Sequence, residues 1–489
     1  MLQGNEQGYT TYEPLSLFVL SSDRRANPYI RSRQRRKFDR RQAMRVGIQA
    51  MTFVSENGKI KAGRLLDISD TGGHIEVDGH EPIEQQRFLI GIPLLSGKQI
   101  HCERVWTRND NGNACRYGVR FINLSPRDKA ELRKRYLLNP DVIAGYAHTL
   151  SARTQSHKQQ EEIKSFFLID VRRALEELIE IDHMIAQQLP HELILQRCTK
   201  TLDELVVAGE RLADIVDNEV LMKDVKQRVR LVLGYFLYQS TVFKRGFEKP
   251  RGYPGDYQML EIVYNNREVS QGIGAYIDRY GLEVPYAVAI RLRKDTMRDI
   301  LKEYLNTSTE PALKILNLAS GGCREIRELC EQQLSYAGVV DLYCIDQDDA
   351  ALDFSRQALS ALDNGCLHVH LVKGNIVRLE DIDLGTDNSF DLIYSIGIAD
   401  YLQDRMLMKI FRDSYNKLKV GGRLIVAYKD KERHKPVALN WYGDWYFIPR
   451  NEEELIRLAQ EAIGKDNISV SVIREPSGVI FFADIKKIK

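Results

Sequence analysis

The sequence predicts a multidomain protein with three kinds of fold: a small six-stranded antiparallel β-domain, an α-helical region and a C-terminal doubly wound α/β sheet. Six short β-forming runs separated by turns predict the first part. Apolar residues that recur at helical spacing predict the second, and strands that alternate with helices predict the third. A chain of 489 residues is also too long for a single hydrophobic core.

The bulk composition is that of a soluble globular protein, with 43% hydrophobic and 28% charged residues. The net charge of +2 indicates no particular partner, and the near-neutral charge outside the N-terminal arm disfavours nucleic acid. Seven scattered cysteines without a CxxC or Cys/His pairing predict reduced thiols, a cytoplasmic location and no metal site. No apolar run approaches the roughly 20 residues of a membrane helix, so we expect no stable membrane insertion.

The N-terminal segment is rich in arginine, and residues 1–35 are expected to form a flexible basic arm. Between Arg24 and Arg45 lie nine arginines and one lysine, against a single acidic residue, Asp39. Such a run is usually a solvated arm, and its alternative role is to bind phosphate.

Residues 36–139 are expected to form one small β-domain, which a helix over Pro126–Leu138 closes. Turn-rich spacers such as Glu56-Asn57-Gly58 separate the predicted strands. Six strands at this spacing are typical of an antiparallel sandwich or barrel. The strands are expected at Val46–Val54, Lys59–Ile68, His74–Val77, Gln86–Ile92, Gln99–Thr107 and Cys115–Phe121.

A linker and a helical region are expected in the middle of the chain. Residues 140–164 are polar and predict the linker, and residues 165–289 predict the helical region. Within Ser165–Leu237, apolar residues such as Phe166 and Val171 recur at the spacing of one helix face. We interpret this pattern as a bundle of long amphipathic helices that serves as a scaffold or as the face of a homodimer.

Residues 290–489 are expected to form the α/β domain, which ends in a pair of strands. Helical stretches lie between most of its strands. The strands are expected at Lys314–Ala319, Val339–Ile345, His368–Lys373, Asp391–Ser395, Arg423–Tyr428, Ile468–Arg474 and Val479–Ile485.

Two short motifs flank the first predicted strands. Arg41 and Arg45 stand at RxxxR spacing before the first strand, and the segment Asp67–Gly73 between two strands contains DxSxxG. Guanidinium groups match phosphate oxygens and the O6/N7 edge of guanine, while Asp67 can accept hydrogen bonds from guanine N1 and N2. Each motif alone is weak, because RxxxR is common in an arginine-rich arm and the acidic segment also suits a plain hairpin turn. The two motifs together, in this order and within one six-stranded domain, indicate a nucleotide-binding site.

This combination resembles the PilZ domain family over roughly residues 36–139. The resemblance implies a six-stranded antiparallel β-barrel that binds cyclic di-GMP. The arginines would contact phosphates and guanine faces, and the turn would contact guanine on the barrel side. The implied ligand residues are Arg40, Arg41, Arg45, Asp67, Ser69, Gly72 and Gly73. The alternative is a degenerate barrel that serves protein contacts alone.

The start of the α/β domain has the pattern of a nucleotide cradle. The strand Lys314–Ala319 runs into Ser320-Gly321-Gly322-Cys323 and then into a helix. Asp346 ends the second strand, where an acidic residue would hold a ribose diol. The absence of GxGxxG disfavours a redox enzyme of the Rossmann type.

This succession, with the segment Leu418–Ala427, resembles class I S-adenosylmethionine-dependent methyltransferases. The resemblance implies a Rossmann-like sheet and S-adenosyl-L-methionine as cofactor. The family's loop of one acid and three alternate glycines is represented by Asn317, Ala319, Gly321 and Cys323, so we expect its geometry to differ. The implied cofactor-binding residues are Tyr253, Ala319, Gly321, Gly322, Asp346, Gln347, Asn375, Ile376, Ser395 and Ile396.

Two further segments narrow the resemblance. The block Lys249–Tyr257 concentrates glycine, proline and aromatic residues, and Asn440–Tyr446 holds two of the three tryptophans. With the glycine loop they resemble methyltransferases that make 3-hydroxy fatty acid methyl ester signals, over about residues 165–489. That likeness implies that the block closes over cofactor and substrate while the helices form a lid.

Methyl transfer to a carboxylate needs no base, because the acceptor is already ionised at neutral pH. It needs alignment and a cation, for which Arg251 or Arg450 would serve. A hydroxyl or amine acceptor would need a base such as His434 or Asp256. Candidates for a catalytic role are therefore Arg251, Asp256, Tyr257, His434 and Arg450, and none is required by the pattern.

The function predicted from the sequence is a methyltransferase for a small or lipid-like carboxylate, modulated by cyclic di-GMP. The alternative is a non-enzymatic cyclic di-GMP effector that uses a degenerate methyltransferase fold for protein interaction. A nucleic-acid methyltransferase is disfavoured, because no Asn/Asp-Pro-Pro-Tyr/Phe motif follows the fourth strand, where Ser395-Ile396-Gly397-Ile398 stands.

Overall fold

The computed structural model describes residues 46–489 except positions 70, 79, 81, 93–94, 96, 111–113, 123, 139, 333–335, 361–365 and 386. The predicted arm and the arginines Arg40, Arg41 and Arg45 lie outside the described residues. The described chain forms two compact units. The barrel–bundle unit runs to Gln239 and includes Gln271–Ile277, and the sheet unit comprises Ser240–Ser270 and Asp278–Lys489.

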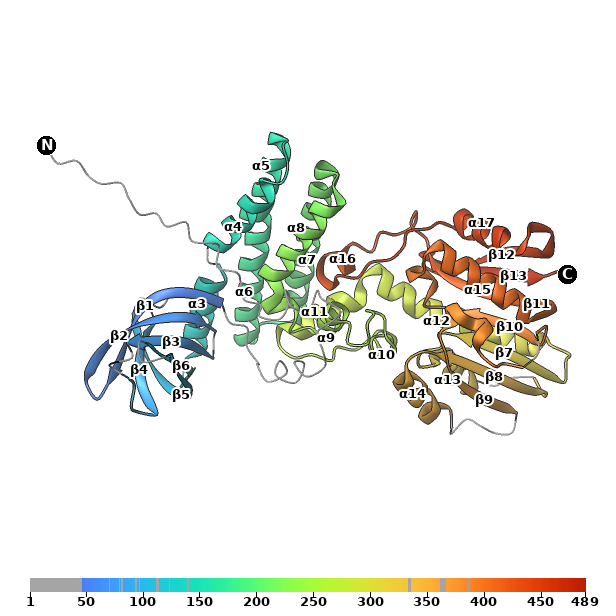
Figure 1. The fold of residues 1–489 in the computed structure, drawn as a ribbon, viewed down its shortest axis with the longest axis horizontal. Coiled ribbons are helices and arrows are strands. Elements are labelled where there is room, and N and C mark those ends of the chain that lie inside the picture. The colour runs from blue at the N-terminus through green and yellow to red at the C-terminus, as the bar shows by residue number, and fades with distance from the viewer. Residues whose placement is uncertain are drawn as a thin grey trace. The chain divides into compact units, whose positions relative to one another are not determined.

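The first part of the barrel–bundle unit is a closed antiparallel barrel with the strand order β1-β2-β3-β6-β5-β4 (Figure 1). Alternate residues of its strands, such as Leu65, Ile75 and Ile90, are fully buried and fill the barrel interior. The predicted barrel is therefore confirmed. Its strands are β1 (Val46–Glu56), β2 (Lys59–Ile68), β3 (Gly72–Asp78), β4 (Arg87–Ile92), β5 (Lys98–Asp110) and β6 (Ala114–Phe121).

Helix α3 (Pro126–Leu137) follows the barrel, and long helices complete the unit. Ser125 caps α3 by accepting a hydrogen bond from the backbone N–H of Asp128, and α3 packs against α6. The bundle comprises α4 (Pro140–Ser151), α5 (His157–Ser165), a π-helical turn η2 (Phe166–Val171), α6 (Arg172–Ala186), α7 (His191–Val216) and α8 (Glu219–Leu237).

The segment 140–164, predicted as a linker, holds α4 and α5 instead. Val142, Ile143, Tyr146 and Leu150 recur three or four residues apart in α4 and are buried. Their burial ties the segment into the bundle, although the polar stretch between these two helices hides the pattern in the sequence. Among the residues that the structure describes, no helix combines the length and the apolar character needed to cross a membrane.

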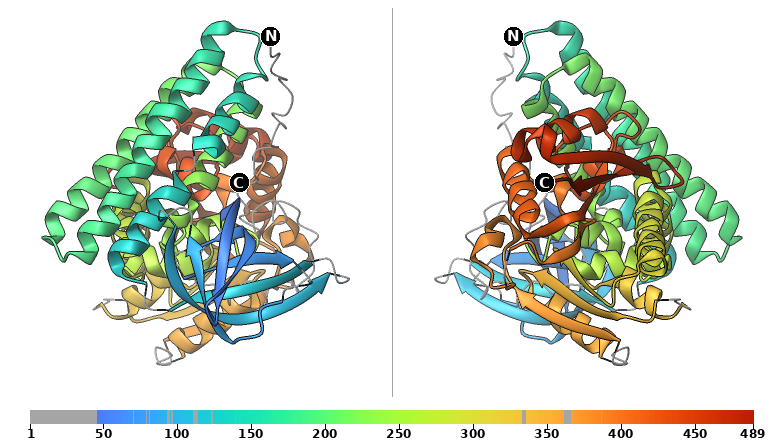
Figure 2. Two further views of the ribbon diagram at one scale, coloured as in Figure 1. Left: turned by 90° about the vertical axis from the view of Figure 1, so that its left-hand side faces the viewer. Right: turned by 90° about the vertical axis from the view of Figure 1, so that its right-hand side faces the viewer.

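The sheet unit contains a seven-stranded sheet with the order β12-β13-β11-β10-β7-β8-β9. This part of the chain carries the yellow-to-red colours in Figure 2. Its strands are parallel except β13, which runs antiparallel to β11 and β12. The predicted doubly wound sheet with a terminal strand pair is confirmed. The strands are β7 (Ala312–Leu318), β8 (Val339–Asp346), β9 (Leu367–Lys373), β10 (Phe390–Ser395), β11 (Leu418–Lys429), β12 (Ile468–Arg474) and β13 (Ile480–Lys487).

Helices cover both faces of the sheet. On one face α15 (Asp404–Lys417), α17 (Glu452–Ile463) and the 3-10 turn η3 (Ile376–Asp381) pack on the strands in one apolar core. Strand residues alternate, and Asn317 and Tyr394 on the other face both donate to Glu325 of α13 (Arg324–Cys330). Strand order reverses between β7 and β10, and ligands of such sheets bind outside the carboxyl ends of strands at that point.

Four helices upstream of β7 also belong wholly or partly to the sheet unit. They are α9 (Thr241–Glu248), α10 (Tyr257–Asn265), α11 (Ile273–Glu283, from Asp278 onward) and α12 (Pro285–Thr307). Two helices that follow β7, α14 (Asp349–Leu359) and α16 (Val437–Gly443), belong to the same unit. The block Lys249–Tyr257 therefore lies in the same compact unit as the sheet.

The fully buried carboxylate of Asp278 ties these upstream segments together. Its Oδ1 accepts hydrogen bonds from Ser240 Oγ (2.6 Å) and the backbone N–H of Val242 (3.1 Å). Its Oδ2 accepts from the backbone N–H groups of Val269 (3.1 Å) and Ser270 (2.9 Å). Four donors around one buried carboxylate leave no room for an amide hydrogen there.

We expect Asp278→Asn to lower the free energy of unfolding of the sheet unit by about 2 kcal/mol, because the new amide nitrogen would face a donor from which it cannot accept. Urea unfolding followed by fluorescence measures the change, since the buried Trp441 and Trp445 lie in this unit. The control Asp299→Asn alters an acid that is 62% exposed on α12 and should change stability by less than about 0.5 kcal/mol. Equal unfolding midpoints for the two variants would contradict the role of Asp278.

Candidate cofactor and ligand sites

The loop that follows β7 keeps a left-handed backbone at three alternate positions. Ala319, Gly321 and Cys323 have φ angles of 55°, 53° and 50°. These are the positions at which the resemblance expected glycines, and only Gly321 is one. An L-residue in this conformation costs roughly 1 kcal/mol, so the surrounding structure holds the loop in place. The backbone thus has, at all three positions, a conformation that glycine adopts most readily.

Asp346, at the end of β8, organises this loop. Its Oδ2 accepts the backbone N–H of Gly321 at 2.9 Å, and its Oδ1 accepts the backbone N–H of Asp348 at 2.9 Å. The residue is 5% exposed. Burial raises the pKa of the Asp346 carboxyl, against the lowering effect of the N–H groups of Asp348 and Gly321. The carboxylate is thus fixed at the carboxyl edge of the sheet beside the loop.

Two buried polar atoms around Asp346 have no hydrogen-bond partner among the described residues. They are Ser320 Oγ in the loop and Asp348 Oδ2 at the N-cap of α14. A buried polar group without a partner costs free energy unless a ligand or water supplies one. Ribose hydroxyls and an ammonium group are suitable donors for these oxygens. The residues present therefore fit an adenosyl cofactor.

The block Lys249–Tyr257 and the helix after it pack against the glycine loop. A Cβ on Gly321 would lie 3.9 Å from the Cβ of Tyr257. Arg251 donates to Asp348 Oδ1 at 2.9 Å and lies over the Tyr257 ring at 5.5 Å. Burial raises the pKa of Tyr253, as do the nearby charges of Asp346 and Asp348. Several predicted residues are thus gathered around one loop.

Helix α10 adds ion pairs to the same contact. Glu261 pairs with Arg324 at 3.0 Å and with Arg327, both on the helix that starts at the loop. A Cβ on Gly322 would lie 3.1 Å from Phe354 and 3.2 Å from Glu261 Oε1. Gly322 therefore allows close packing of α10 and α14 around the loop.

The remaining predicted cofactor residues lie at the carboxyl ends of their strands, with different environments. Gln347 is exposed, and Asn375 is exposed and caps η3 through the backbone N–H of Val377 (3.0 Å). Ile376 is buried in the apolar core. Buried Ser395 donates to the carbonyl of Leu318 at 2.9 Å, which joins β10 to β7, and Ile396 beside it is half-buried.

Among the residues proposed for catalysis, Asp256 and Arg450 are engaged in buried structural contacts. Asp256 accepts from Arg245 Nε (2.9 Å) and Nη2 (2.7 Å), and its Oδ1 also caps α10. Arg450 is 3% exposed and donates to Asp404 (2.8 Å), to the Tyr428 hydroxyl and to the Leu402 carbonyl (2.7 Å each).

The other residues proposed for catalysis lie closer to the loop or to β11. Tyr257 is buried against Phe354, with ring centroids 5.3 Å apart, and Arg251 has the contacts given above. Burial and then the charge of Lys429 lower the pKa of His434 to about 4, so its imidazole is neutral at pH 7.

Sequence patterns missed Ser320, Asp348 and Phe354 around the cofactor loop and the buried Arg293 on α12. An arginine on an apolar helix face, between Ile290 and Met297, is the signal that would have pointed to Arg293. Ser320 and Asp348 adjoin predicted residues, but nothing in the sequence marks them as unpartnered.

The acidic turn of the barrel is built mainly by its own hydrogen bonds. Ser69 N donates to the Gly72 carbonyl at 2.7 Å, and Ser69 Oγ does so at 3.1 Å. A Cβ on Gly72 would lie 2.2 Å from the Val119 carbonyl, and one on Gly73 would lie 3.0 Å from the Asp67 carbonyl. Both glycines are therefore required by close strand packing.

A row of partly exposed side chains extends from the turn over strands β2, β3 and β5. Asp67 Oδ2 lies 3.6 Å from His74 Nδ1, and the His74 ring lies 4.9 Å from the Trp106 ring. Trp106 is 40% exposed and lies against Gly118, where a Cβ would be 2.0 Å from the indole nitrogen. An exposed aromatic ring beside the turn can stack on a base. Sequence patterns also missed this residue.

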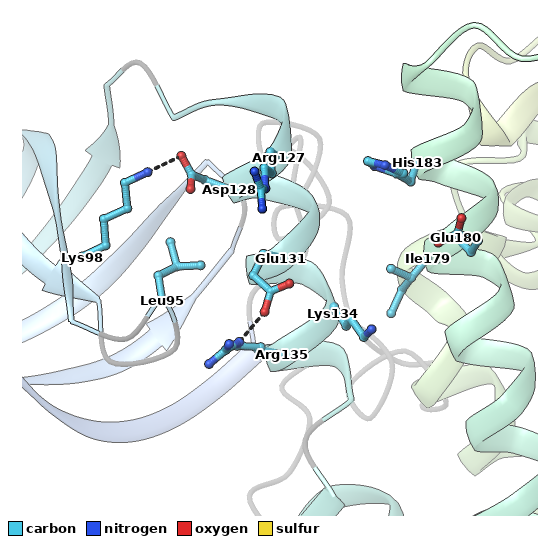
Figure 3. A pocket seen from close by; sticks show the side chains of 10 residues that line it. All are labelled: Leu95, Lys98, Arg127, Asp128, Glu131, Lys134, Arg135, Ile179, Glu180 and His183. Atoms are coloured by element: carbon cyan, nitrogen blue, oxygen red, sulfur yellow. Dashed lines mark hydrogen bonds and ion pairs between the residues drawn. The ribbon is translucent and has the colours of Figure 1, made fainter.

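The barrel–bundle unit also contains a cavity of about 440 Å³ between α3 and α6 (Figure 3). Arg127, Glu131 and Lys134 on α3 face Ile179, Glu180 and His183 on α6. Ion pairs of Lys98 with Asp128 (2.7 Å) and of Arg135 with Glu131 (2.5 Å) line it as well. Asp67, Ser69, Gly72 and Gly73, the predicted cyclic di-GMP residues that the structure describes, do not line this cavity.

Two family models match the chain. The model described as PilZ domain matches residues 34–138, and the model described as methyltransferase domain matches residues 316–426. Each match coincides with one of the sites described above. A comparison with curated proteins found no match.

Solved structures are similar to parts of this chain at low identity and low TM-score. A possible exported protein from Bordetella parapertussis is 17% identical, with a TM-score of 0.39, over 65% of this chain and 97% of its own. Magnesium protoporphyrin IX methyltransferase from Synechocystis, with bound SAH, is 12% identical, with a TM-score of 0.32, over 42% and 87%. A TehB-like SAM-dependent methyltransferase from Corynebacterium glutamicum is 15% identical, with a TM-score of 0.27, over 40% and 87%.

The first family match covers the closed barrel, and the second covers the sheet with the Asp346 loop. The chain therefore joins a PilZ domain, whose ligand is cyclic di-GMP, to a methyltransferase domain, whose cofactor is S-adenosyl-L-methionine.

Proposed function

We propose that this protein transfers the methyl group of S-adenosyl-L-methionine to the carboxylate of a small or lipid-like acceptor, and that cyclic di-GMP modulates this activity. The observation that supports the enzyme is the Asp346 carboxylate, which is buried and held by Gly321 and Asp348 beside two unpartnered polar atoms. The likeness of the Lys249–Tyr257 block to its counterpart in 3-hydroxy fatty acid methyltransferases favours such acids as acceptors.

The bound cofactor would supply an electrophilic methyl group on a sulfonium. The residues of the chain would hold its ribose at Asp346, its methionine part at the loop of Ser320 and Gly321, and its open side under Tyr253 and Tyr257. A carboxylate acceptor needs no proton removed, which agrees with the engagement of Asp256 by Arg245 and with the lowered pKa of His434, which makes its imidazole a weak base. Alignment and exclusion of water are then the main tasks of the protein.

Modulation would require that cyclic di-GMP bind one conformation of the protein more tightly than another. The dinucleotide would order the arginine-rich arm against the turn of Asp67 and Ser69. Helix α3, which directly follows the barrel, packs against α6 of the bundle. The segment Gln271–Ile277 belongs to the barrel–bundle unit and its flanks to the sheet unit, so backbone joins the two units at three points. A change of conformation in the bundle would thus be transmitted to the methyltransferase through these backbone connections.

The non-enzymatic alternative is not favoured. A sheet that served only as a protein-interaction platform would have no need for three left-handed loop residues or for a buried carboxylate that fixes them. Binding of S-adenosylhomocysteine, the demethylated cofactor, separates the two functions directly.

We expect Asp346→Ala to weaken S-adenosylhomocysteine binding by about 30-fold or more, because it removes charge-assisted hydrogen bonds and frees the Gly321 N–H. Isothermal titration calorimetry measures the affinity. The matched control is Asp349→Ala, which alters an acid three residues along that is 68% exposed and pairs with Lys373. Unchanged affinity in Asp346→Ala would overturn the assigned cofactor site.

We expect the rate of methyl transfer to stay level between about pH 6 and pH 9 and to fall below about pH 5, where the acceptor carboxyl takes up a proton. His434 should add no titration in this range, because its pKa is lowered to about 4. A pH–rate profile of the wild type and of His434→Ala tests both statements. A rate that climbs steadily with pH would instead indicate a hydroxyl or amine acceptor.

We expect Arg41→Ala to abolish cyclic di-GMP binding and to leave S-adenosylhomocysteine binding intact, because the variant removes one guanidinium of the RxxxR pair. Titration of the full chain with each ligand measures both affinities. Arg31→Ala, elsewhere in the same arm, is the control and should bind as the wild type does. Retained affinity in Arg41→Ala would show that other arginines of the arm bind the dinucleotide.

A further inference from the structure

A buried arginine lies close to the proposed cofactor site. Arg293 on α12 is 3% exposed, and its Nε has no hydrogen-bond partner among the described residues. It shares its helix face with buried Tyr286, Ile290 and Met297. A guanidinium buried among apolar side chains is costly unless its donors and its charge are satisfied.

The groups around Arg293 are uncharged or already engaged. Its neighbours are the hydroxyls of Tyr264 and Tyr286 and the carboxylate of Asp400. Asp400 is itself engaged, since Oδ2 accepts from Tyr286 (3.1 Å) and Oδ1 from the backbone N–H of Lys429 (2.9 Å). The ammonium of Lys429 is a second buried cation, only 2% exposed.

Lys429 has a carboxylate of its own beside it. Asp430 is buried, acts electrostatically on the Lys429 ammonium, and also accepts from Arg474 Nη2 at 2.9 Å, a guanidinium that pairs with Glu452 as well. Lys429 Nζ donates to the His434 carbonyl at 3.2 Å. The unmet group is therefore Arg293, whose Nε lacks, among the described residues, an acceptor that a bound carboxylate would supply.

Arg293 reaches the carboxyl edge of the sheet where the strand order reverses. Its Nη2 lies 3.8 Å from the position of a Cβ on Gly397, two residues after β10 ends. Tyr401 lies within electrostatic range of both Arg293 and Tyr253, and Tyr253 within range of Asp346. Tyr401 and Tyr253 thus link the surroundings of Arg293 to those of Asp346.

Aromatic side chains surround the same place. The Phe447 ring lies 4.7 Å from Tyr286, 5.5 Å from Tyr401 and 5.9 Å from Trp445, centroid to centroid. Trp445 Nε1 donates to the Tyr401 hydroxyl at 2.7 Å. A Cβ on Gly255 of the Lys249–Tyr257 block would lie 3.0 Å from the Trp445 ring. These rings suit an acceptor with an apolar body and one charged end.

We propose that Arg293 binds the carboxylate of the methyl acceptor. Arg251 and Arg450 are less suited, because Arg251 pairs with Asp348 and Arg450 is enclosed by Asp404, Tyr428 and Leu402. This assignment rests on the proposed function and names the residue that selects its substrate class. Arg293 is a positioning residue in this role.

The chemistry balances without a proton or a further reactant. The bond from a carboxylate oxygen to the methyl carbon forms as the sulfonium–methyl bond breaks. The negative charge of the acceptor and the positive charge of the sulfonium cancel, and the products are a methyl ester and a neutral thioether. Arg293 would hold one carboxylate oxygen and leave the other free to attack.

The test uses the full chain, S-adenosylmethionine with a tritiated methyl group, and a panel of fatty acids and 3-hydroxy fatty acids with their alcohols and amides. The product should form from acids alone, and alkali should release its label as volatile methanol, as carboxyl methyl esters do. Arg293→Gln should raise the KM for the acid by about 30-fold with a smaller change in kcat, and Arg293→Lys by less. The affinity for S-adenosylhomocysteine should not change.

The matched control is Arg291→Gln, on the same helix, where the wild-type side chain donates to the Leu282 carbonyl at 2.8 Å. Its KM should match the wild type. An unchanged KM in Arg293→Gln, an alkali-stable product, or equal use of alcohols or amides would overturn the inference while the methyltransferase stands. If Arg293→Gln does not fold, as judged by lost S-adenosylhomocysteine binding, Arg293→Lys decides through its KM. A wild type that binds no S-adenosylhomocysteine would instead overturn the proposed function.

Discussion

The hydrogen bond from the Gly321 N–H to the Asp346 carboxylate is the contact on which the methyltransferase site depends. It joins the loop after the first strand of the sheet to the end of the second strand, and so sets where α13 begins. Ala319 and Cys323 hold left-handed conformations on either side of this contact, which an isolated loop would not adopt. A single buried carboxylate thus shapes the loop, accepts from Asp348 and stands ready for a ribose.

Buried charged side chains differ in whether all their hydrogen-bonding atoms have partners, and those without partners remain available to a ligand. Arg245 pairs with Asp256, and Arg450 is satisfied by Asp404, Tyr428 and the Leu402 carbonyl, which fixes the segments that surround the site. Arg293 is also buried, but its Nε has no partner among the described residues. The difference follows from hydrogen-bond partners rather than from residue type, since each group contains an arginine of similar burial. A buried polar group without a hydrogen-bond partner is therefore the better indicator of a ligand site.

The sequence predicts the two β-architectures well, because turns and alternating apolar residues mark each strand. It also places Asp346 and Gly321 at strand ends, since cofactor loops of such sheets follow buried strands directly. It does not predict α4 as a helix of the bundle, because a polar stretch beside it masks Val142 and Tyr146. Nor does it predict Arg293, because partners from three separate segments, at Tyr264, Tyr286 and Asp400, create its environment.

The discontinuous boundary of the sheet unit bears on how this protein folds. Asp278 accepts hydrogen bonds from Ser240 and Ser270, which precede the segment Gln271–Ile277 of the other unit. Helix α12 begins before residue 290, where the strand pattern alone would divide the chain. A fragment from residue 290 onward would lose the first five residues of α12, Tyr286 among them. During synthesis, α9 leaves the ribosome well before α16, against which it packs. The unit must therefore close contacts of long sequence separation, which slows folding and leaves apolar helix faces exposed in the meantime.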